Sequence, residues 1–152
     1  MVAIVRRWWW VLSGVGGVAL GGLIWVYVYP AAHETISFML GRPHFAECTT
    51  AIKTEAALPS GRYRITEHVC TASGRSMYIV FLLPANDLLA MPLFNSVDLP
   101  VPQEVREHDA NTYEIVLAEA LPDGTDRLPV RLTAMGVPER QYNFFDGMPQ
   151  EY

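Results

Sequence analysis

The chain has 152 residues, of which 51% are hydrophobic and 18% are charged, and its formal net charge at pH 7 is −5. A chain of this length accommodates one modest domain together with a short additional segment. The acidic balance disfavours binding to the phosphate backbone of nucleic acids, so we predict no nucleic-acid partner.

The most distinctive N-terminal feature is an apolar run without any charge from Trp8 to Tyr29, preceded by two arginines. A helix of this length covers the roughly 30 Å of a bilayer core. Since positive flanks stay in the cytoplasm, the sequence predicts a cytoplasmic stub over 1–7, a transmembrane signal anchor over 8–29 and a periplasmic C-terminal part. The expected location is the bacterial inner membrane. A cleavable signal peptide is the alternative, although its apolar core is usually only about 7–15 residues long.

Small residues recur along one side of this apolar run. Such a stripe lets another helix approach closely in lipid, where packing drives association. We therefore expect contact with the bilayer and with other integral-membrane subunits. The predicted helix-packing residues are Ser13, Gly14, Gly17, Gly21 and Gly22.

A membrane-proximal helical linker is predicted over 30–43. Its helical part runs from Ala31 to Leu40 and stops at the following Gly-Arg-Pro sequence. From residue 44 the pattern changes to that of strands, which predicts a periplasmic β-domain over 44–152.

Two hairpins stand out in this β-domain. Strands over 45–53 and 62–72 flank a turn at 58–61, and a continuous apolar run over 77–83 is typical of a central strand covered on both faces. Alternating residues over 113–117 and 128–134 flank an Asp-Gly turn. The predicted fold is thus a single N-terminal transmembrane α-helix followed by a small, mainly-β domain, either an antiparallel sandwich or an open barrel.

The long connection over 84–111 and the C-terminal segment are unusually apolar. Long connections in compact domains are often functional or held by a partner. The alternative is that the apolar residues of the connection cap the end of the sheet core and that the C-terminal aromatic residues dock on the domain itself. Under the first interpretation, the partner-docking residues are Leu88, Leu89, Met91, Leu93, Phe94, Tyr142, Phe144 and Phe145.

Cys48 and Cys70 are the only cysteines. If the first hairpin turns near residue 59, strand partners have numbers that add up to 118, and the two cysteines face each other. The sequence therefore predicts a structural disulfide, worth roughly 3 kcal/mol for a loop of this size.

A metal or redox site is the alternative for these cysteines, with His44 and His68 as further ligands. Two sulfurs and two imidazoles suit a tetrahedral ion, but the closely paired spacing of such sites is missing. His33 and His108 are expected at the surface. No nucleophile motif or phosphate loop occurs, so we predict no enzyme activity and no cofactor.

These features favour a non-catalytic accessory subunit of a larger integral-membrane complex of the respiratory or photosynthetic electron-transport type. Its outer domain is expected to dock on neighbours, including a basic soluble protein. The alternatives are a membrane-anchored assembly factor or chaperone, and a periplasmic metal- or redox-handling protein.

Overall fold

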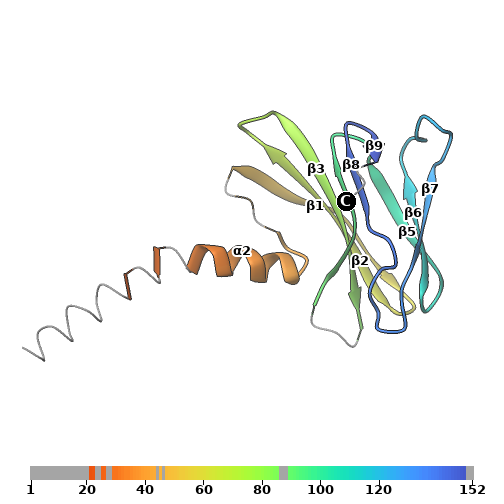
Figure 1. The fold of residues 1–152 in the computed structure, drawn as a ribbon, viewed down its shortest axis with the longest axis horizontal. Coiled ribbons are helices and arrows are strands. Elements are labelled where there is room, and N and C mark those ends of the chain that lie inside the picture. The colour runs from red at the N-terminus through yellow and green to blue at the C-terminus, as the bar shows by residue number, and fades with distance from the viewer. Residues whose placement is uncertain are drawn as a thin grey trace, which may run out of the picture. The chain divides into compact units, whose positions relative to one another are not determined.

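A computed structural model of the chain describes residues 21–22, 25–26, 29–43, 45, 47–85 and 89–149 (Figure 1). The chain divides into two compact units, 1–36 and 37–152. Helix α2, Tyr29–Met39, crosses this boundary, and the strands all belong to the second unit. The sites described below lie in that second unit.

The predicted transmembrane architecture is contradicted. Most of the 8–29 segment lies outside the described residues, and in the described part of the chain no helix is both apolar and long enough to cross a bilayer. Helix α2 has 11 residues, about half of what a span of roughly 20 residues requires, and it includes His33 and Glu34. The transmembrane fold class and the inner-membrane location are therefore corrected and not retained, whereas the β-domain is confirmed.

The predicted linker helix is present, and a glycine ends it. Gly41 has φ +64°, its N–H donates to Phe38 O at 2.9 Å, and Arg42 N–H donates to Ser37 O at 2.9 Å. These two hydrogen bonds form a Schellman cap, which favours glycine at the left-handed position. The cap turns the chain toward the β-domain that follows.

The strands form a sandwich of two sheets. The larger sheet has the order β1-β2-β3-β4-β8-β9 and the smaller one has the order β5-β6-β7 (Figure 1). In chain order the strands are β1 Cys48–Leu58, β2 Gly61–Cys70, β3 Arg75–Pro84, β4 Met91–Val97, β5 Pro102–Asp109, β6 Thr112–Leu117, β7 Arg127–Arg131, β8 Tyr142–Phe145 and β9 Met148–Pro149.

The main core lies between the two sheets. Alternate residues of β6 and β7 point inward, among them Tyr113, Ile115 and Val130, and they meet Ile65 and Leu82 of the larger sheet. The outer face of β2 and β3 is also covered, because Phe38 packs edge-on against Phe81 with ring centroids 5.4 Å apart. The ring of Phe45 packs edge-on against His68 of β2 at 5.0 Å, so contacts on the outer face contribute to the burial of successive residues in both strands.

The predicted hairpins are confirmed. β1 and β2 pair around a turn at 59–60, and Cys48 lies opposite Cys70 as the spacing predicted. A bulge at residue 53 shifts the register toward the turn. β3 is the doubly covered central strand, and β6 and β7 form the second hairpin.

The predicted long connection is not irregular, because it contains β4 and β5. Each of these two strands contains a proline, which made them hard to predict from the sequence, since proline is usually depleted in sheet interiors. Leu93 and Phe94 of β4 are at most 1% exposed and belong to the core. For these two side chains, the position in the structure therefore agrees with the alternative interpretation, in which apolar residues of the connection belong to the sheet core.

The cap at Gly41 supports a stability prediction. A Cβ added there would lie 2.9 Å from Ala90 Cβ, whereas one added at Gly74, with φ +67°, would meet nothing within 4 Å. Both alanine variants suffer the left-handed backbone penalty of about 1–2 kcal/mol. We expect Gly41→Ala to lose clearly more stability than Gly74→Ala in urea denaturation, because only Gly41→Ala adds a clash. Equal losses would contradict the close contact with Ala90.

Candidate functional site

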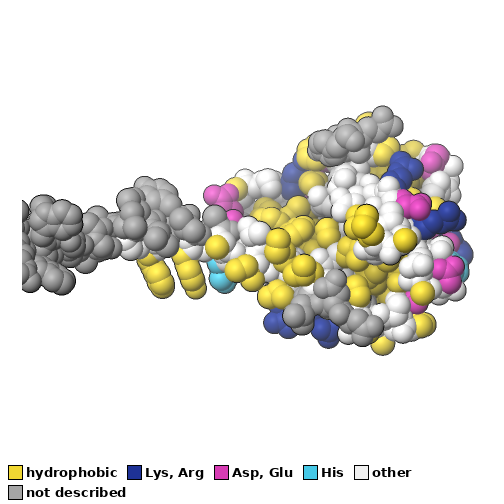
Figure 2. Space-filling model, turned by 60° about the horizontal axis from the view of Figure 1, so that its bottom comes forward, with side chains coloured by type: hydrophobic (Ala, Val, Ile, Leu, Met, Phe, Trp, Pro, Cys, Tyr) yellow, Lys and Arg dark blue, Asp and Glu magenta, His cyan; other side chains and the backbone are white. Residues whose placement is uncertain are grey.

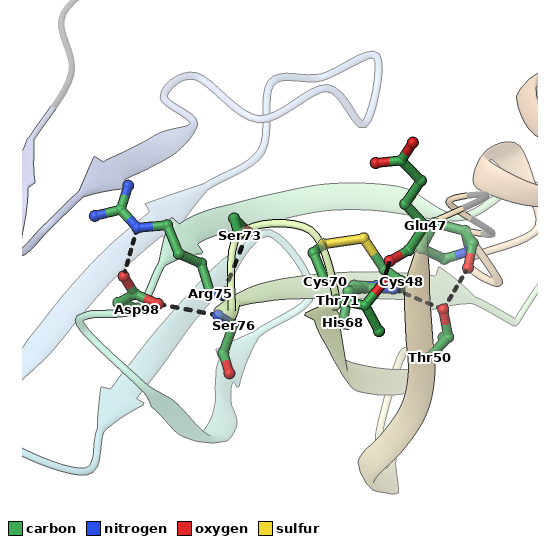
Figure 3. The surroundings of a disulfide bond; sticks show 11 residues. Glu47, Cys48, Thr50, His68, Cys70, Thr71, Ser73, Arg75, Ser76 and Asp98 are labelled. Atoms are coloured by element: carbon green, nitrogen blue, oxygen red, sulfur yellow. Dashed lines mark hydrogen bonds and ion pairs between the residues drawn. A yellow bond between two sulfur atoms is a disulfide. The ribbon is translucent and has the colours of Figure 1, made fainter.

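The disulfide lies at the edge of the larger sheet, near a buried histidine. Cys48 and Cys70 are bonded, which confirms the predicted disulfide. Figure 3 shows the bond beside His68, Thr50 and Thr71. Thr71 N–H and Oγ1 both donate to Glu47 O, at 3.0 and 3.1 Å, so hydrogen bonds close the same strand ends that the disulfide links.

His68 is completely buried on the outer face of β2. Its Nδ1 lies 2.8 Å from Thr50 Oγ1, its Nε2 lies 3.0 Å from Thr66 Oγ1, and the ring of Phe45 stands edge-on at 5.0 Å. Burial lowers the pKa of His68 from 6.5 to about 4, and the neighbouring Glu67 carboxylate offsets only part of that effect. The imidazole is therefore neutral at pH 7 and bonded at both nitrogens.

The metal alternative gains no support from this geometry. The sulfurs of Cys48 and Cys70 are bonded to each other, and both nitrogens of His68 have hydroxyl partners. His44 lies outside the described residues. Within the described ranges, no group of three His, Cys, Asp or Glu side chains is arranged to hold a metal ion. His33 and His108 are exposed, as predicted.

A groove of about 440 Å³ lies at the rim of the sandwich. Three segments that are distant in sequence form it: the β4–β5 connection, the start of the β6–β7 connection and the β8–β9 turn. We call it the rim groove, and its lining residues are Leu99, Pro100, Val101, Ala118, Glu119, Ala120, Leu121, Pro122, Asp146, Gly147 and Met148.

Backbone hydrogen bonds hold the three segments of the rim groove together. Ala118 N–H donates to Val101 O at 2.9 Å, and Gly147 N–H donates to Leu99 O at 3.1 Å. The groove is thus preformed, and its volume falls within the range of about 300–1,000 Å³ that is usual for ligand sites.

An ion network fixes the acidic side of the rim groove. Arg75 on β3 pairs through Nε with Asp98 Oδ2 at 3.0 Å and also pairs with Asp146. Its guanidinium lies over the ring of Phe145, 4.6 Å from the centroid. Figure 3 shows the Arg75–Asp98 pair and the hydrogen bond from Ser76 N–H to Asp98. One arginine thus serves two carboxylates, and the network remains negative.

The predicted docking residues that the structure describes fall into three groups. Leu93, Phe94 and Phe144 are buried in the core, and Met91 and Tyr142 are partly buried against it. Leu89 and Phe145 are exposed by 52% and 45%, so only these two offer a large apolar surface. Leu88 lies outside the described residues.

The predicted helix-packing residues lie mostly beyond the described part of the chain. Ser13, Gly14 and Gly17 are not among the described residues, whereas Gly21 and Gly22 are exposed. A Cβ added at Gly21 or Gly22 would meet nothing within 4 Å. No close packing partner therefore lies against these two glycines among the described residues.

The rim groove could not be predicted from the sequence, because its three segments are not neighbours in the chain. Its apolar side chains are still visible at the surface, where Leu99 and Met148 are exposed by 48% and 69%. Figure 2 shows the face seen from below in Figure 1, on which hydrophobic side chains also gather, with charged side chains around them. The sequence feature that could have indicated the groove is the set of apolar residues flanking the prolines at 100, 102 and 122.

Comparisons of the chain with protein-family models, with curated proteins and with solved structures find no match. The functional interpretation therefore depends on the geometry of the sites themselves.

Proposed function

We propose that the β-domain is a non-catalytic accessory domain that binds a basic partner protein at the rim groove. The observation that carries this proposal is the lining of the groove, which consists of nine apolar residues or glycines and two acids, Glu119 and Asp146. An apolar hollow with acidic edges complements an apolar side chain flanked by lysine or arginine.

The charge distribution around the groove favours a basic partner. In the part of the chain that the structure describes, no lysine or arginine lines it. Arg75 is shared between two carboxylates, and Glu119 has no ion-pair partner among the described residues. The whole chain is also acidic, with a net charge of −5. Such a field raises the association rate of cationic partners and repels anionic ones.

The lining chemistry supports binding and offers little for catalysis. The described lining residues include no serine, threonine, cysteine, histidine, tyrosine or lysine. Nucleophilic catalysis needs a nucleophile beside a base. Among the described lining residues, only the two carboxylates could take either of these roles. The exposed apolar side chains of Leu99 and Met148 instead resemble the centre of a small protein interface.

The direct test uses two synthetic peptides and the full chain. One peptide has an apolar leucine–phenylalanine centre flanked by two lysines on each side, and the other has glutamates in place of the lysines. We expect the basic peptide to bind about tenfold tighter or more at low ionic strength, and the difference to shrink as salt screens the charges. The measurement is an NMR titration that follows the methyl groups of Leu99, Leu121 and Met148.

A matched pair of variants locates the binding site. Met148→Lys places a cation in the groove, whereas Met135→Lys changes a methionine that is 88% exposed and does not line it. We expect Met148→Lys to weaken the basic peptide about tenfold, or about 1.4 kcal/mol, and Met135→Lys to bind like the parent chain. Equal affinities for the two peptides, no binding of either at millimolar concentration, or equal effects of the two variants would contradict the proposal.

A further inference from the structure

Three arginine side chains line a second pocket of about 250 Å³, on the outer face of the larger sheet. Arg62 and Arg64 come from β2, and Arg42 comes from the segment that follows helix α2. The other lining residues are Leu40, Leu83, Pro84, Leu89 and Ala90. No acid lines this pocket among the described residues, although acids outnumber bases in the chain by 16 to 11.

Arg64 is the fixed centre of this pocket. Its side chain is 3% exposed, its Nε donates to Glu55 Oε2 at 2.7 Å, and its Nη1 donates to Gly41 O at 2.8 Å. A buried guanidinium is costly unless it is paired and hydrogen-bonded, and these two partners meet that requirement. They also hold the plane of the guanidinium in one orientation, which is useful for recognising a planar or tetrahedral oxyanion.

The positive charge of the pocket is only partly compensated. Glu55 accepts from Arg64 and also from Arg62 Nη1 at 3.2 Å. The hydrogen bond from Arg64 holds the pKa of Glu55 below its usual value, so this carboxyl is charged at pH 7. Arg42 forms no ion pair among the described residues. Among the described residues, one carboxylate thus faces three guanidinium groups, which gives these four groups a net charge of about +2.

We propose that this arginine pocket binds a phosphate group. A phosphate monoester carries about −1.5 to −2 charges at pH 7 and so matches the excess charge, whereas a carboxylate neutralises only half of it. Arginine is the residue best suited to bind phosphate oxygens through two parallel N–H donors. The leucine and proline side chains of the lining can contact the carbon atoms of a small ester.

The test is isothermal titration calorimetry on the full chain, with three probes at equal ionic strength. These are inorganic phosphate, the ester O-phosphoserine and acetate. We expect at least one phosphate probe to bind at least tenfold tighter than acetate. Stronger binding of inorganic phosphate identifies a free ion as the ligand, and stronger binding of O-phosphoserine identifies a phosphate carried on an organic group. Either result supports the pocket, whereas no phosphate binding at millimolar concentration overturns it.

Variants of the exposed arginines assign the binding to this pocket. We expect Arg42→Gln and Arg62→Gln each to weaken phosphate binding about tenfold, because each removes one charge and its donors. The control is Arg106→Gln, since Arg106 is 46% exposed and pairs with Glu104 on β5. Arg64 stays unchanged because its loss would disturb folding through Glu55. Circular dichroism checks that the variants are folded, and unchanged affinity in both Arg42→Gln and Arg62→Gln would overturn the assignment.

Discussion

Acidification from pH 7 to pH 4 is expected to remove about 3 kcal/mol of stability through His68 alone. The pKa of its buried imidazole is about 4 in the folded chain, against 6.5 for an ordinary histidine. Each unit of difference is worth about 1.4 kcal/mol, so the full difference gives about 3 kcal/mol. The unfolded chain binds the extra proton first. The contribution is therefore complete above pH 6.5 and is lost as the pH falls toward 4.

Urea denaturation at pH 7.0, 6.0, 5.0 and 4.5 measures this loss. The pKa values of Glu55 and Glu67 are lowered by their partners Arg64 and Lys53, so most of their contributions are lost below their ordinary value of 4.5. The loss of stability between pH 6.5 and 4.5 is therefore due mainly to the histidine.

Two variants separate His68 from other groups. His68→Gln keeps a hydrogen-bonding side chain between Thr50 and Thr66 but cannot be protonated, so we expect its stability to be nearly constant from pH 6.5 to 4.5. His108→Gln, at an exposed position, should retain the full loss of the parent chain. If His68→Gln loses as much stability as the parent chain in this window, the neutral buried histidine is not the cause.

Removal of the Cys48–Cys70 disulfide is expected to lower the free energy of unfolding by a similar amount, about 3 kcal/mol. The bond joins residues 22 positions apart and restricts the unfolded chain. β1 depends on it strongly, because among the described strands this edge strand pairs only with β2, and most of its residues are exposed. The double variant Cys48→Ser/Cys70→Ser should show the loss in chemical denaturation.

A reducing agent provides the control for the disulfide. Dithiothreitol should lower the stability of the parent chain to that of the double variant and should leave the double variant unchanged. A parent chain that is equally stable with and without dithiothreitol, once thiol titration shows both cysteines reduced, would contradict the expected stabilisation.

Local signals in the sequence predicted much of the β-domain. The turn at 58–61 and the two cysteines fixed the register of β1 and β2, because a short turn leaves little choice of pairing. The unbroken apolar run of β3 indicated cover on both faces, and the structure places Phe81 against Phe38 on the outer one. The turn before Arg127 similarly separated β6 from β7.

Long-range pairing was beyond these signals. β4 and β8 are parallel neighbours, with Phe94 opposite Tyr142. They are not connected by a short turn, so the local sequence does not indicate that they pair. The aromatic C-terminal segment predicted docking, and the structure places it on the domain itself. The rim groove and the arginine pocket were missed for the same reason, since each combines segments that meet only after folding.

The transmembrane prediction failed for a different reason. Hydropathy and flanking charge alone favoured a bilayer-spanning helix over 8–29, whereas the described helix is short and includes His33 and Glu34. The proposed partner binding and phosphate binding therefore depend only on residues 40–148 of the second unit.

The parallel pairing of β8 with β4 also dictates an order of events during synthesis. The first four strands of the larger sheet can form while the ribosome is still producing the smaller one, but the outer backbone edge of β4 stays uncovered until residues 142–144 have emerged. The unpaired backbone N–H and C=O groups of an uncovered strand edge can pair with a strand of another nascent chain. The final segment of the domain thus protects the newly made protein against aggregation as well as completing its sheet.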